Sequence, residues 1–128
     1  MSSLSNYLEE KIINHVFRNT PVTSPEVVYL ALYTTDPTDA DVGTEVTGGT
    51  YARKEITLTA PTNGMTKNAA DVEFAVATAN WGTVTHAGVR DAATGGNLLL
   101  HGPLNLNKTI AIGDQFRVPA NQLTFTLD

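Results

Sequence analysis

Residues 82–104, GTVTHAGVRDAATGGNLLLHGPL, contain two strand-like segments separated by a Gly-Gly pair. In residues 82–91 the side chains alternate between two faces, as they do along a β-strand. One face carries Val84, His86, Gly88 and Arg90, and the other carries Thr83, Thr85, Ala87 and Val89. Gly95-Gly96 tolerates the positive φ of a tight turn, after which residues 97–104 read as a second strand. The stretch predicts two strands that could be neighbours through a turn at residues 91–96.

Similar short β segments run through most of the chain. Residues 26–34, EVVYLALYT, are apolar on both alternating faces, which predicts a strand covered on both sides. Asn63-Gly64 and Gly113-Asp114 add further turn signals. The pattern predicts a mainly β fold, a single antiparallel β-sandwich or jelly-roll-like domain over residues 26–128. The eight predicted strands are residues 26–34, 51–59, 71–77, 82–91, 97–104, 109–112, 115–118 and 122–127.

Residues 3–18, SLSNYLEEKIINHVFR, predict an N-terminal α-helix within residues 1–20, so that residues 1–128 form one domain. Ser3 is the expected N-cap and Asn19 the expected end. The apolar residues at helical spacing are Leu4, Tyr7, Leu8, Ile12, Ile13, Val16 and Phe17. Because they cover more than half of the circumference, the helix either lies deep in the fold or meets a second molecule. In the second case we expect Tyr7, Ile13 and Phe17 to make protein contacts.

The composition excludes several function classes. The chain has no cysteine, which removes disulfides, thiol catalysis and cysteine-ligated metals. Thirteen acidic and eight scattered basic residues give a net charge of −5, which disfavours nucleic-acid and membrane-surface binding. No apolar run approaches the length of a transmembrane helix, and the N-terminus lacks the features of a secretory leader. We expect a soluble, unprocessed protein.

The most acidic segment is DPTDADVGTEVTGGTYAR, residues 36–53. Calcium loops of the EF-hand type place their carboxylates in a fixed register, and Glu45 comes too early for it. The segment is therefore expected to be a long exposed loop, with Asp39, Asp41 and Glu45 as contacts to a neighbouring protein. Shortening residues 38–47 should then weaken binding and leave the domain folded.

The other candidates for chemistry are few. His86 and His101 could be neighbours across the turn at residues 91–96, but a metal would need a third ligand, for which Asp91 is the nearest choice. The serines lie near the N-terminus, outside any Gly-x-Ser-x-Gly elbow, and no phosphate-binding loop is present. We therefore expect no catalytic residues, no metal and no cofactor.

Four segments together resemble a family of small tailed-bacteriophage proteins, commonly labelled phage tail fibre proteins or virion structural proteins. The most distinctive parts are GTEV-x-GG-x-YAR and W-G-x-V-T-H-x-G-x-x-DAATGGNLL, and the chief departure is Arg90, where an apolar or aromatic residue is expected. The segments are LSNYLEEKIINHVFR, VVYLALYTTDPTDADVGTEVTGGTYARKEI, ANWGTVTHAGVRDAATGGNLLLHGPL and LTFTLD. They cover nearly the whole chain in the same order.

The resemblance implies a non-enzymatic structural protein of the virion, assembled in the bacterial host cytoplasm. Its implied partners are other virion proteins, either the major capsid protein or tail proteins, and further copies of itself. Because the chain lacks the repeats and coiled coils of long fibres, a capsid decoration or cement role is expected by analogy of fold. Such a protein would be present in hundreds of copies.

Two alternatives make different predictions. A tail-fibre or other tail-associated protein for host attachment would be present in few copies, with Trp81, Tyr51 and Tyr33 as a possible sugar platform. A metal-dependent enzyme would bind metal stoichiometrically and respond to chelation.

Overall fold

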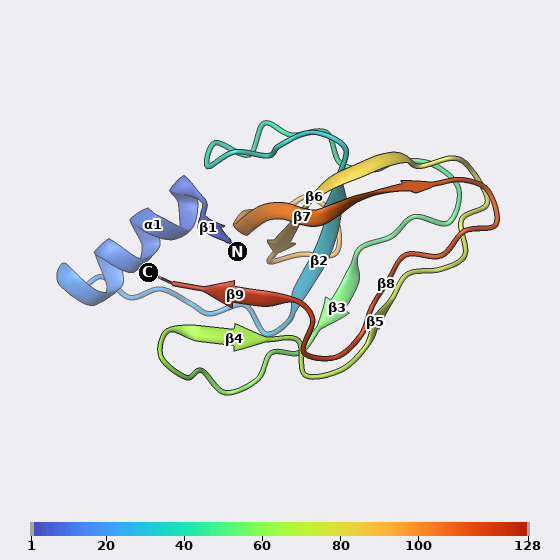
Figure 1. Ribbon diagram of the computed structural model, residues 1–128. Helices are drawn as coiled ribbons and strands as arrows, with labels where there is room; N and C mark the ends of the chain where they lie inside the picture. Colours follow the sequence, from blue (N-terminus) through green and yellow to red (C-terminus); the bar gives the residue numbers. More distant parts are fainter. Residues whose placement is uncertain (1, 128) are drawn as a thin grey trace.

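The computed structural model describes residues 2–127, which fold around an antiparallel five-stranded sheet in the order β1-β7-β6-β2-β3. Two small ladders, β4-β9 and β5-β8, lie on one side of this sheet (Figure 1). The strands are β1 Ser3–Leu4, β2 Val28–Tyr33, β3 Lys54–Ile56, β4 Met65–Lys67, β5 Val72–Glu73, β6 Gly82–Arg90, β7 Leu98–Ile110, β8 Arg117–Val118 and β9 Thr124–Thr126. The helical segments are α1 Asn6–Ile12 and η1 Ile13–Phe17. The predicted class, mainly antiparallel β with an N-terminal helix, is confirmed, while jelly-roll topology and the single-domain division stay predictions.

The predicted hairpin forms the centre of the sheet, as β6 and β7. Val89 pairs with Leu100 and Gly88 with His101, so the two strands are antiparallel neighbours. Gly95 and Gly96 both have positive φ, 61° and 68°, as the turn requires. The segments predicted at residues 97–104 and 109–112 are parts of one long strand, β7.

The simple alternation predicted for residues 82–91 is wrong at one point. The register between β6 and β7 shifts between Val84 and His86, where β7 carries a bulge. Val84 consequently joins Ala87 and Val89 in the main core instead of sharing a face with His86. A second shift, between Val89 and Arg90, similarly separates Leu98 from Leu100.

Strand β2 is covered on both sides, as its sequence predicts. Leu30 and Leu32 belong to the main core, and Ala31 and Tyr33 pack with Leu98 in a smaller cluster on the opposite face. The main core lies between the sheet and the C-terminal ladders, which contribute Phe74, Phe116 and Phe125 among others. On the opposite face Arg90 links Tyr33 of the smaller cluster to Asp41 in the loop after β2.

Several elements differ from the sequence prediction in their first residue, in their existence or in the face that they bury. Ser3 pairs with His101 in β1, and Ser5 is the N-cap, since its Oγ accepts from Leu8 N at 3.1 Å. Strand β4 was not predicted; it pairs with β9 after the turn at Asn63-Gly64, where both φ values are positive. Val76 is about half exposed and does not share the buried face of Val72 and Phe74.

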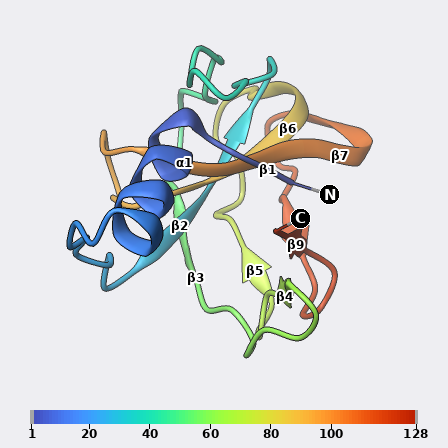
Figure 2. The ribbon, with the colours of Figure 1, turned by 90° about the vertical axis from the view of Figure 1, so that its left-hand side faces the viewer.

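Helix α1 contacts β1 and β7 and lies in front of the sheet in Figure 2. The helical segment continues as η1 beyond the β body (Figure 1). Leu4 and Leu8 pack against the main core, but neither α1 nor η1 contains a fully buried residue. Asn19, with φ of 52°, follows the helix, as predicted for its end. The helix therefore does not lie deep in the fold.

Candidate interaction site

The loop between β2 and β3 folds back over one face of the five-stranded sheet. Its Asp39 and Asp41 bind side chains of β7 and β6, and its Glu45 binds Arg53 at the end of the same loop. Oδ1 of Asp39 lies 2.7 Å from Nε2 of His101. Asp41 and Glu45 each accept a pair of hydrogen bonds from an arginine. All three residues expected to contact a partner protein thus have internal partners. Their role in binding another protein stays a prediction.

Arg90 is the buried partner of Asp41. Its guanidinium donates to both carboxylate oxygens at 2.8 and 2.9 Å, to the hydroxyl of Tyr33 at 3.0 Å, and to the carbonyls of Gly95 and Gly96. Burial alone would lower the pKa of Arg90, but the bonds to Asp41 and Tyr33 outweigh it and raise that pKa, so the charge is permanent. In place of the expected apolar or aromatic residue stands a cation whose five hydrogen bonds all go to oxygen acceptors.

Arg53 forms a second arginine–carboxylate ion pair that is also bonded to backbone carbonyls. It binds the carboxylate of Glu45 and donates to the carbonyls of Ala92 and Gly95 at 2.8 Å, so it joins the loop to the hairpin turn. Glu45 also accepts from the hydroxyl of Tyr51 at 2.6 Å. Burial by itself would raise the pKa of Glu45, but the bonds from Arg53 and Tyr51 prevail and hold that pKa below its usual value.

The loop is consequently part of the folded domain. Val46 is buried in the main core, and its N–H donates to Leu32 O at 2.9 Å. A Cβ on Gly43 would lie 2.6 Å from the Cα of Pro37, so the chain turns tightly here. The expectation that residues 38–47 could be shortened without harm to the fold needs correction, because their removal would deprive Arg90 and Arg53 of their carboxylate partners and the core of Val46. Val42, 70% exposed, is the loop's large apolar contribution to the surface.

The two histidines are close, as predicted, but Asp91 is not their third neighbour. The carboxylate of Asp36 lies 3.9 Å from a ring nitrogen of His86 and 3.9 Å from one of His101. Asp91 instead accepts from the backbone and side-chain N–H groups of Asn97. Within residues 2–127, no group of three His, Asp or Glu side chains has an arrangement that could hold a metal.

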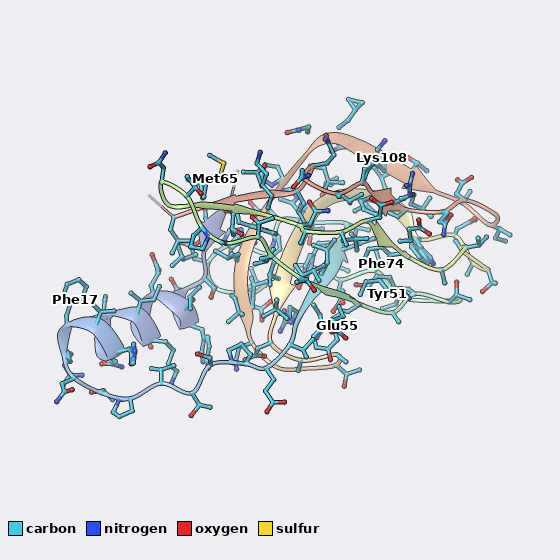
Figure 3. All side chains as sticks on the ribbon, turned by 90° about the horizontal axis from the view of Figure 1, so that it is seen from below. Phe17, Tyr51, Glu55, Met65, Phe74 and Lys108 are labelled. Carbon is cyan, nitrogen blue, oxygen red and sulfur yellow. The ribbon has the colours of Figure 1, made fainter. Side chains whose placement is uncertain are left out.

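The aromatic residues suggested as a sugar platform lie in the interior. Trp81 and Tyr33 are 4% and 1% exposed. Tyr51 lies beside Phe74 (Figure 3) and stacks on it, with ring centroids 6.1 Å apart. Tyr51 also meets Trp81 edge-on, with ring centroids 5.4 Å apart. The suggestion of a sugar platform is therefore wrong, because these rings pack in or against the hydrophobic core.

A groove of about 580 Å³ runs between the middle of β7 and the C-terminal segment that holds β8 and β9. Sequence reasoning missed it, because its walls come from segments that meet only in the folded chain. Apolar side chains such as Phe116 and Phe125 line it together with polar ones. Lys108 and Arg117 also line it, and Arg117 is paired with Asp71 and Glu73. Leu106, 70% exposed, stands at its edge.

The model of one protein family, described as Podophage GP4 fiber I protein gp80, matches residues 3–126. The chain belongs to this family. A search of curated proteins finds no significant match. The matched range runs from β1 to the end of β9, so the helix and the loop between β2 and β3 both belong to the fiber I family region.

Membership of the fiber I family confirms the resemblance to phage tail fibre and virion structural proteins. It identifies the chain as a phage protein of fibre type and favours the tail-fibre alternative over the expected capsid decoration. Among the described residues, no helix has the length and apolar character needed to cross a bilayer.

Proposed function

We propose that this protein is a non-enzymatic structural component of the tail fibre apparatus of a tailed phage, where it binds other virion proteins. The observation that carries the proposal is the fiber I family match over residues 3–126, which takes in every element of the fold. The absence of cysteine and of a nucleophile elbow in the sequence supports a role without catalysis.

The loop between β2 and β3 suits such a role because internal hydrogen bonds hold it in one conformation before binding. Hydrogen bonds to charged groups are among the stronger ones in proteins, and here they fix Asp41 and Glu45 against the sheet. A surface that is already ordered loses little conformational entropy when a partner docks. We therefore propose that the loop's outer side, around Val42 and Asp36, forms a contact with a neighbouring virion protein.

Labelling of purified particles tests the location. Gold-conjugated antibodies against this protein should mark the tail in electron micrographs, and quantitative mass spectrometry should find few copies per particle. Label spread over the capsid, with hundreds of copies, would instead support the decoration role.

Incorporation into particles tests the contact. Val42→Asp places a charge on the exposed loop, and Ile112→Asp does the same at a side chain of similar exposure, 66%, on another surface. Both variants should fold, as judged by circular dichroism. We expect Val42→Asp to lower incorporation about tenfold and Ile112→Asp to leave it unchanged; equal incorporation of both would contradict the contact.

A further inference from the structure

We propose that two copies of this chain pair through their N-terminal helices, packed antiparallel about a two-fold axis beside Ile13. The inference goes beyond the proposed function, since it concerns self-association and holds for any position in the virion. It rests on an uncovered apolar patch and on the charges at the two ends of that patch.

The apolar patch consists of Ile13, Val16 and Phe17, whose side chains are 52%, 61% and 78% exposed. Phe17 lies at the outer end of the helix, away from the β body (Figure 3). Phe17 is the most exposed large apolar side chain among the described residues. Each such side chain gains roughly 1.5–3 kcal/mol when it is fully buried, so the patch favours association.

The position of η1 beyond the β body accounts for this exposure. In a continuous α-helix Val16 would follow Leu8 and Ile12 at four-residue spacing, on the stripe that faces the body. Val16 lies in η1, which packs mainly against α1, so the strands that partly cover α1 do not cover Val16. Ile12 is half-buried, whereas Val16 is exposed.

Charged residues flank the patch on both sides. Glu9 and Glu10 are exposed one turn before it, and no ion pair within residues 2–127 includes either of them. Arg18 follows the patch, and its guanidinium donates to Asn14 Oδ1 at 2.7 Å without a carboxylate partner in the same range. Lys11, half-buried on the same side as the two glutamates, has its Nζ 5.3 Å from the centre of the Tyr7 ring. The end that holds Glu9, Glu10 and Lys11 therefore keeps a net negative charge, and the end at Arg18 is basic.

This distribution of charge along the helix favours a second copy that packs antiparallel to the first. A two-fold axis beside Ile13 places Glu9 of one chain opposite Arg18 of the other, and symmetry repeats the contact. A parallel pair would bring like charges together and is disfavoured. The acidic and basic ends therefore complement each other only when a copy of the same helix is reversed.

The pairing is expected to be weak in solution. Stable complexes usually bury about 800 Å² on each partner, and one short helix face offers less. Copies fixed close together on one particle meet at a high effective concentration, which strengthens the same contact. Covalent trapping is therefore the appropriate measurement.

Because the chain has no cysteine, a single introduced cysteine reports the geometry directly. Ile13→Cys places a thiol beside the axis, and Leu106→Cys places one at an exposed apolar site on another surface. In a glutathione redox buffer we expect Ile13→Cys to form disulfide-linked dimers at least tenfold faster than Leu106→Cys. Equal rates, or no dimer from Ile13→Cys, would overturn the proposal.

Charge reversal in the Ile13→Cys background tests the orientation. Glu9→Arg alone and Arg18→Glu alone should each slow dimer formation about fivefold, since both symmetric pairs become repulsive. The double variant restores opposite charges in an antiparallel pair and should recover the original rate. Failure of this rescue, with circular dichroism unchanged, would exclude the antiparallel arrangement. Phe17→Asp should slow the reaction about tenfold or more.

Discussion

The guanidinium of Arg53 donates two hydrogen bonds to the carboxylate of Glu45, from Nε at 2.9 Å and from Nη2 at 2.8 Å. This pair joins the loop after β2 to the start of β3, and the remaining donors of Arg53 reach the hairpin turn between β6 and β7. One side chain therefore connects the loop and the start of β3 to a turn 39 to 42 residues further along the chain. The side chains of Arg53 and Glu45 are 8% and 24% exposed, so the pair is shielded from solvent.

Arg53→Lys should destabilise the protein in spite of the conserved charge. A lysine cannot reproduce the planar fork that binds Glu45 and two carbonyls together. We expect the free energy of unfolding, measured in urea, to fall by about 2 kcal/mol. Arg18→Lys is the matched control, because Arg18 is exposed and bonded only to the nearby Asn14, and it should change stability by less than about 0.5 kcal/mol. Equal effects would contradict the role given to Arg53.

The lowered pKa of Glu45 predicts loss of stability in acid. A carboxyl whose folded-state pKa is depressed stabilises the protein above its ordinary value, 4.5, and this contribution is lost as the pH falls through the folded pKa. The free energy of unfolding should therefore drop below about pH 4.5, and drop less in Glu45→Gln. Glu55→Gln, at an exposed site in β3, should retain the wild-type pH profile. Identical profiles for wild type and Glu45→Gln would contradict the assignment.

Asp41 and Arg90 should be energetically coupled. Asp41→Asn leaves the buried guanidinium without its carboxylate and should cost about 2 kcal/mol. In an Arg90→Met background, which restores an apolar side chain, the same change should cost less than about 0.5 kcal/mol. A double-mutant cycle in urea measures the difference; additive effects would show that the observed ion pair contributes nothing to stability.

Gly88→Ala should be destabilising because there is no room for a methyl group. A Cβ at this position would lie 2.8 Å from Cδ1 of Leu98 and 3.0 Å from Cε2 of Tyr33, both fully buried. Overpacking of this kind costs roughly 1–3 kcal/mol, and we expect a thermal midpoint lower by several degrees. An unchanged midpoint would mean that the smaller cluster rearranges freely.

The sequence predicted correctly those strands and turns that depend on residues close together in the chain. Strand β2 reads as apolar on both faces and is buried on both faces, and the Gly-Gly and Asn-Gly turns lie where their positive φ values are needed. The alternation failed at Val84, because a bulge depends on how β6 pairs with β7 and leaves no local pattern. The two-residue strand β1 was missed for the same reason: it exists only through its pairing with β7.

The same distinction applies to the candidate site, where the sequence indicated some residues and only the fold showed their contacts. The sequence singled out Asp39, Asp41, Glu45 and Arg90 as unusual, and the composition and the order of motifs pointed to a phage structural protein. Only the tertiary structure showed that Asp41 meets Arg90, because those residues are 49 positions apart and the register of the central strands brings them together. Local patterns determine which residues can form strands and turns, whereas the packing of distant strands decides which charges are neutralised and which apolar side chains, such as Phe17, remain exposed for a partner.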